Sequence, residues 1–168
     1  MKKMKLLFVA AGFLAILAQG VNAQIAGKDV RFKKHHLWDE FYTEAATVAD
    51  VNKDGKTDII AGARWFEAPD WKAHDIWIHK KFYYTKGYSD SFLNFATDVN
   101  EDGWVDLICF DFPGKEVYWF ENPAGTEALW KRYLIDSIAS NESPMMVDVD
   151  GNGKMDLVYG NEKLGQML

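Results

Sequence analysis

The sequence predicts an all-β fold, a β-propeller built of four-stranded antiparallel blades. The first reason is an acidic nonapeptide that occurs three times, as DVNKDGKTD at residues 50–58, DVNEDGWVD at 98–106 and DVDGNGKMD at 148–156. The copies start 48 and then 50 residues apart, a period typical of propeller blades. The second reason is that the intervening segments are short, rich in β-branched and aromatic residues and bounded by turn-forming residues. No long stretch after the first 23 residues shows helical periodicity.

Residues 1–23 have the three parts of a secretory signal peptide. A basic start, MKKMK, precedes the apolar run LLFVAAGFLAILA, and the small-residue sequence VNA ends the segment. The apolar run has 13 residues, which is too short to span a bilayer comfortably. We therefore expect cleavage after residue 23, no membrane insertion, and a secreted or periplasmic protein.

Residues 24–168 are expected to form the propeller segment. Residues 24–45 are expected to contribute an orphan outer strand. Residues 46–90 should form blade 1, with strands at 46–50, 57–63, 64–68 and 75–82. Residues 91–140 should form blade 2, with strands at 95–99, 105–112, 116–121 and 131–136. Residues 141–168 should form a partial blade 3, with strands at 145–149 and 155–160.

Two complete blades and two partial ones do not close a ring, because propellers have about four to eight blades. We therefore expect the remaining blades to come from a longer chain or from self-association. A sandwich or meander with a fortuitous repeat is the alternative fold.

The nonapeptide carries oxygen-bearing side chains at positions 1, 3, 5 and 9 in every copy, and glycine at position 6. Oxygen ligands on a tight loop suit a hard cation, and flexible coordination by six to eight oxygens favours calcium. The backbone carbonyl at position 7 would be a further ligand. The sequence thus predicts up to three structural Ca²⁺ ions. The predicted ligands are Asp50, Asn52, Asp54, Lys56, Asp58, Asp98, Asn100, Asp102, Trp104, Asp106, Asp148, Asp150, Asn152, Lys154 and Asp156.

Two other interpretations of the nonapeptide are possible. Asp, Asn and Gly are common turn formers, so the loops could be solvated hairpins without metal. An EF-hand begins similarly, but it needs a glutamate at position 12 and flanking helices. Position 12 is Ala61, Cys109 or Tyr159 here, and the flanks read as strands, which excludes an EF-hand.

Charge and cysteine content limit the partners. The chain has 25 acidic and 19 basic residues, a formal net charge of −6, which argues against nucleic acid as a partner. Cys109 is the single cysteine, so no internal disulfide can form, and its setting in DLICF is typical of a buried strand.

The segments ATVADVNKDGKTDIIAGA and FATDVNEDGWVDLICF resemble the FG-GAP and VCBS repeats of secreted bacterial β-propellers, which are similar to the calcium-bearing blades of integrin α subunits. In that family the corresponding loops bind calcium structurally. The family includes adhesion modules, binding scaffolds and the propeller portions of carbohydrate-active enzymes, and the fold alone does not choose among these functions.

The preferred interpretation is a calcium-binding module that acts as a binding or scaffold domain for a carbohydrate or protein ligand and is not itself an enzyme. The alternative is the propeller portion of a carbohydrate lyase or dehydratase, with its site on the face opposite the calcium loops. Its candidate acid–base residues are Glu44, Asp90 and Glu142, which lie in connections expected on that face.

Overall fold

The computed structural model describes residues 32–140, 142–161 and 166–167. The predicted signal peptide lies outside this part of the chain. The chain divides into two compact units, Met1–His35 and His36–Leu168, and the strands found in the described residues all belong to the second unit. The described residues form strands and no helix, which confirms the all-β class, and none of their segments is a helix able to cross a membrane.

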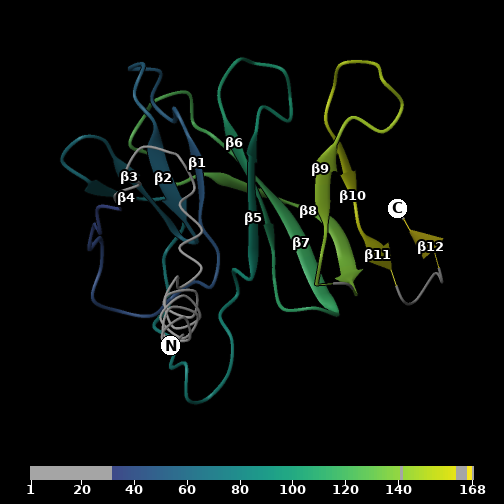
Figure 1. Cartoon of the computed structure of the whole chain (residues 1–168), viewed down its shortest axis with the longest axis horizontal. Coiled ribbons are helices and arrows are strands. Elements are labelled where there is room, and N and C mark those ends of the chain that lie inside the picture. The colour runs from purple at the N-terminus through teal and green to yellow at the C-terminus, as the bar shows by residue number, and fades with distance from the viewer. Residues whose placement is uncertain (1–31, 141, 162–165, 168) are drawn as a thin grey trace, which may run out of the picture. The chain divides into compact units, whose positions relative to one another are not determined.

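The first four-stranded sheet is the predicted blade 1 (Figure 1). It contains β1 (Thr47–Ala49), β2 (Asp58–Ala61), β3 (Arg64–Glu67) and β4 (Lys72–Asp75), paired antiparallel in chain order. The first three strands lie where the sequence predicts them.

The predicted outer strand at residues 75–82 is wrong, because the chain turns back earlier. The N–H of Trp71 donates to the carbonyl of Glu67 at 2.6 Å, and Lys72 then pairs directly with Glu67. After β4 the chain leaves the sheet edge. The side chain of Ile76 is fully buried, whereas Ile78 is 78% exposed.

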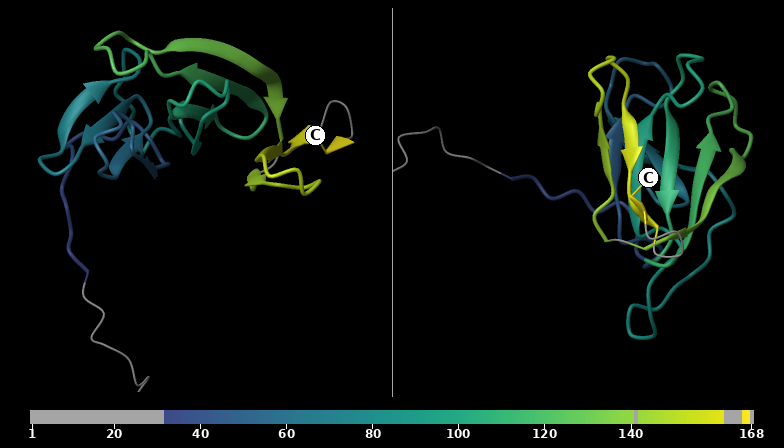
Figure 2. Two further views of the ribbon diagram at one scale, coloured as in Figure 1. Left: turned by 90° about the horizontal axis from the view of Figure 1, so that it is seen from above. Right: turned by 90° about the vertical axis from the view of Figure 1, so that its right-hand side faces the viewer.

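The second four-stranded sheet is the predicted blade 2. It contains β5 (Leu93–Thr97), β6 (Asp106–Phe110), β7 (Lys115–Glu121) and β8 (Lys131–Ala139), again antiparallel in chain order. The third repeat provides β9 (Met145–Val147) paired with β10 (Asp156–Val158), followed by β11 (Gly160–Asn161) paired with β12 (Gln166–Met167). Within the described residues the sheets are those of partial propeller blades and form no closed ring (Figure 2).

The predicted orphan strand is not found in the described part of residues 24–45. Residues 32–45 contain no strand, and the side chain of Phe32 is 94% exposed. A strand forms where a neighbouring strand shares its backbone hydrogen bonds. No strand of the described residues pairs with residues 32–45.

Strand β6 joins two hydrophobic cores because side chains alternate across a strand. Leu107 and Cys109 pack on one face with residues of blade 1, among them Ile60 and Trp65. Ile108 and Phe110 pack on the other face in a cluster that includes Tyr159 of the third repeat. All five residues of β6 are buried. Cys109 is 2% exposed and burial raises the pKa of its thiol to about 12, which confirms that it is a core residue.

We expect Leu107→Ala to lower the free energy of unfolding by about 2–5 kcal/mol, because it leaves a cavity between the two blades. Leu107 is fully buried. The matched control is Leu134→Ala in β8, where the side chain is 58% exposed and the loss should be small. Urea unfolding followed by tryptophan fluorescence measures both. Equal losses would contradict the shared core.

Candidate metal site

The three nonapeptide loops occupy the same place in the three repeats. Each connects the first and second strands of its sheet, β1 to β2, β5 to β6 and β9 to β10, and they lie at the same end of the strands (Figure 1). The register is also the same. The residue before position 1 pairs with the aspartate at position 9, as Ala49 with Asp58, Thr97 with Asp106 and Val147 with Asp156.

One hydrogen-bond pattern recurs in all three loops. The position 1 carboxylate accepts from the N–H groups of positions 5 and 6, the position 3 oxygen from position 5, and the position 5 oxygen from position 7. In the first loop, for example, Asp50 accepts from Asp54 at 3.0 Å and from Gly55 at 2.9 Å. The equivalent bonds are present in the second and third loops. The repeated spacing therefore gives repeated geometry.

Two positions in each loop have left-handed backbone. The glycines at position 6 have φ of +83°, +85° and +88°, as a tight loop requires. Position 4 is also left-handed, with φ of 60° at Lys53, 61° at Glu101 and 76° at Gly151. Sequence reasoning missed position 4. Its one signal is that the third copy has glycine there.

The position 9 aspartates fasten the loops to the sheets. Asp58 is fully buried and accepts from the N–H of Val51 at 3.0 Å and from the N–H of Ala68, beyond the end of β3, at 2.8 Å. Asp106 is also fully buried. Its carboxylate accepts from the N–H of Val99 at 3.0 Å and from the N–H of Asn122, beyond the end of β7, at 2.8 Å.

Burial raises the pKa of the Asp106 carboxyl above its usual range, while the two backbone N–H groups act in the opposite direction. In the third loop, Val149 donates to Asp156 at 2.9 Å.

The donor set fits a hard cation. In the third loop one carboxylate oxygen from each of Asp148, Asp150 and Asp156 lies within 4.8 Å of the others. Calcium–oxygen distances of about 2.3–2.6 Å allow one ion to contact oxygens at such separations. In the first loop Lys56 Nζ lies 2.5 Å from Asp54 Oδ2, and this hydrogen bond lowers the pKa of the Asp54 carboxyl. The Lys56 ammonium group therefore neutralises part of the negative charge of the first loop.

Two family models match the chain. The FG-GAP repeat model matches residues 41–69, and the FG-GAP-like repeat model matches residues 98–159. Together they cover more than half of the sequence and the whole of all three nonapeptides. The chain belongs to the FG-GAP repeat family. No curated protein and no solved structure matched it.

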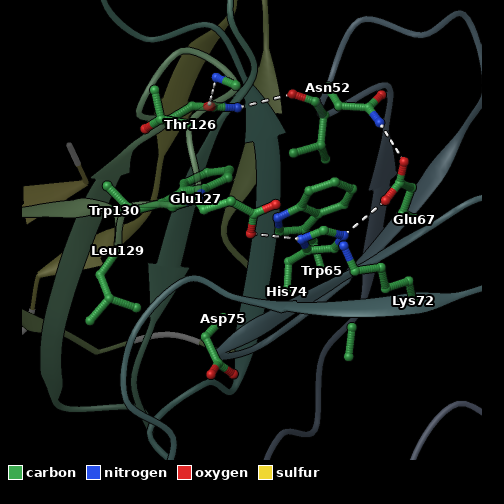
Figure 3. Close-up of a pocket in the computed structure, with 15 residues that line it drawn as sticks. Asn52, Trp65, Glu67, Lys72, His74, Asp75, Thr126, Glu127, Leu129 and Trp130 are labelled. Atoms are coloured by element: carbon green, nitrogen blue, oxygen red, sulfur yellow. Dashed lines mark hydrogen bonds and ion pairs between the residues drawn. The ribbon is translucent and has the colours of Figure 1, made fainter.

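A pocket of about 510 Å³ lies where the first FG-GAP repeat meets the second (Figure 3). His74 stacks on Trp65 with ring centroids 4.1 Å apart. Its Nε2 lies 2.9 Å from Glu67 Oε2, and its Nδ1 lies 3.4 Å from Glu127 Oε2 in the connection between β7 and β8. Asn52, at position 3 of the first loop, donates to Glu67 Oε1 at 3.2 Å. A chain of polar contacts thus joins the first loop to the pocket.

The second FG-GAP repeat contains the same arrangement with tyrosine in place of histidine. Tyr133 stacks on Trp119 with ring centroids 4.4 Å apart and donates to Glu121 at 2.7 Å. Asn100 donates to the other oxygen of Glu121 at 3.3 Å. Sequence reasoning missed Glu67 and His74 as site residues. The available signal was the tripeptide WFE, which occurs in WFEAP at residues 65–69 and again in WFENP at residues 119–123.

The structure places Glu44 against the segment that carries Asp90, because the N–H of Glu44 donates to the carbonyl of Ser91 at 3.2 Å. Both oxygens of Glu44 accept from the backbone N–H of Ser89, at 3.0 and 3.2 Å, and the Ser89 hydroxyl also donates to it. Asp90 forms an ion pair with Lys80, with Oδ2 lying 3.4 Å from Nζ. Glu142 is exposed, and no contact described in the structure joins it to Glu44 or Asp90. Tyr42, in the connection before β1, is 6% exposed, and burial raises its pKa to about 12.

We expect Asp106→Asn to lower the free energy of unfolding by about 1–3 kcal/mol, even in EDTA. The amide has one acceptor oxygen, so one of the two backbone N–H groups would be buried without a partner. Asp70→Asn, at an exposed residue, is the control. Urea unfolding of the chelated proteins measures the difference. A loss of stability seen only with calcium present would mean that Asp106 acts as a metal ligand alone and that its two backbone hydrogen bonds do not stabilise the fold.

Proposed function

We propose that the chain is a calcium-binding FG-GAP repeat module of an exported β-propeller that acts as a binding or scaffold domain. The observation that carries the proposal is the repeated loop, in which the same four oxygen-bearing positions take part in the same hydrogen bonds three times. Donor sets made only of oxygen favour calcium over softer metals such as zinc. An exported location suits this role, because calcium is abundant outside the cytoplasm.

The predicted ligands at positions 1, 3, 5, 7 and 9 would hold one ion in each loop. Three carboxylates within nine residues repel one another, and a divalent cation would offset that repulsion. The third loop has carboxylates at positions 1, 3 and 9, whereas the first two have asparagine at position 3. The role of the ion would be structural. Each loop joins the first two strands of its sheet, and Asp58 and Asp106 tie two of the loops to the backbone just beyond the third strand.

The ligand of the module would bind to the segments that connect strands at the end of the sheets opposite the nonapeptide loops. Three tyrosines are exposed there: Tyr83 by 54%, Tyr84 by 79% and Tyr88 by 58%. The Tyr88 ring stacks on Phe112 with centroids 4.5 Å apart, which joins the connection after β4 to the one after β6. Exposed rings of this kind support a carbohydrate or protein ligand. The missing blades would come from a longer chain or from a second copy.

Millimolar calcium should raise the melting temperature of the full chain by an amount on the order of 10 °C, because a ligand at about 100 times its Kd adds about 2.7 kcal/mol to stability. EDTA should reverse the rise. Differential scanning calorimetry measures it.

The triple variant Asp50→Asn, Asp98→Asn and Asp148→Asn should lose the response. The control carries Asp39→Asn and Asp70→Asn, two exposed aspartates outside the loops, and should keep it. A wild-type melting temperature that does not change with calcium, or a triple variant that responds like wild type, would refute the proposal.

A further inference from the structure

Side chains at position 4 of one loop contact position 7 of the next loop. Lys53 Nζ, at position 4 of the first loop, lies 4.2 Å from the ring centroid of Trp104, at position 7 of the second. Glu101, at position 4 of the second loop, accepts a hydrogen bond from Lys154 Nζ, at position 7 of the third. One contact is a cation–π interaction and the other is an ion pair. The two contacts differ in chemistry but join the same two positions. The contact between position 4 of one loop and position 7 of the next is therefore a feature of the repeat.

The backbone at both positions is close to candidate ligands. Position 4 lies between the ligands at positions 3 and 5, and it is held in the left-handed region, which residues other than glycine rarely adopt. The carbonyl of position 7 is itself a candidate ligand. A contact between these positions therefore joins the ligand-bearing backbone of one loop to that of the next.

Two further observations concern the region where the first loop meets the second repeat. A Cβ atom added to Gly125 would lie 2.8 Å from the Trp104 ring, so this ring is seated closely on the connection between β7 and β8. The side-chain amide of Asn122, which is 4% exposed, donates to the carbonyls of Val51 at 3.1 Å and Val105 at 3.0 Å. The position 7 lysine of the first loop, Lys56, turns instead to Asp54 in its own loop.

We propose that the position 4 to position 7 contacts couple cation binding between adjacent loops. The proposal rests on the calcium-binding function argued above. An ion that orders the second loop fixes the backbone that carries Glu101, which in turn holds Lys154 and the position 7 carbonyl of the third loop. Binding to one loop then raises the affinity of its neighbour. Lys53, Trp104, Glu101 and Lys154 are positioning residues that need not contact the ions through their side chains.

The test uses the full chain with Asp50→Asn and Asp54→Asn, which leaves the second and third loops as calcium sites. Isothermal titration should show the second ion binding about five-fold more tightly than the first, the size of a modest coupling between sites. Adding Glu101→Gln should make the two sites independent. Exchanging the charges, with Glu101→Lys and Lys154→Glu, should restore the coupling. The matched control is Glu40→Gln, which removes a glutamate–lysine ion pair with Lys81 outside the loops.

A second readout needs no calcium. In EDTA, a double-mutant cycle of Glu101→Gln and Lys154→Gln should give a favourable interaction that weakens as salt is added, because both side chains are about two-thirds exposed, at 67% and 68%.

Coupling that persists in the Glu101→Gln chain, or that charge exchange does not restore, would overturn the inference. Calcium uptake by two independent loops in the starting chain would overturn the coupling alone. No calcium uptake by the wild-type chain would overturn the proposed function as well.

Discussion

The buried carboxylate at position 9 is the interaction on which the other features of the first two repeats depend. Asp58 and Asp106 are fully buried, and each accepts one backbone N–H from its own loop and one from beyond the third strand of its sheet. An aspartate so placed fixes the loop, the second strand and the end of the third strand relative to one another. The oxygens at positions 1, 3 and 5 are held in order because position 9 holds the ends of the loop.

The same region joins one repeat to the next. Asn122 follows β7, and its N–H donates to Asp106 while its side chain reaches the carbonyl of Val51 in the first loop. Trp77 of the first repeat stacks on Phe120 of the second, with ring centroids 4.4 Å apart. Polar bonds near the loops and aromatic packing deeper in the core therefore fix the same pair of sheets. A change in loop geometry would alter the packing between the repeats, and a structural role therefore suits the proposed ions.

Much of the fold was predictable because the nonapeptides act as fixed points in the sequence. Their spacing indicated the repeat length, and short segments rich in β-branched and aromatic residues between turn-forming residues indicated the first three strands of both complete sheets. The outer strand of the first sheet was not predictable in this way. Residues 75–82 are apolar enough for a strand, but the early turn at Trp71 had already brought Lys72 into register with Glu67. Residues 32–37 have strand-like composition, but no strand forms there. A strand needs a neighbouring strand to pair with, and the composition of one segment does not reveal whether such a neighbour is present.

The candidate site was predictable in its oxygen positions and not in its contacts. Position 9 was expected to be a metal ligand, and its part in joining backbone segments depends on burial that spacing does not reveal. The pocket residues Glu67 and His74 are brought together by strand register, so only a comparison of the two WFE segments could have indicated them.

Native mass spectrometry of the full chain in calcium would test the calcium-loop proposal most directly, because it counts bound ions on the folded protein. Three bound ions, falling to two when either Asp50 or Asp148 alone is changed to asparagine, is the expected result. A folded protein that carries no calcium, or a count that these substitutions leave unchanged, would contradict it.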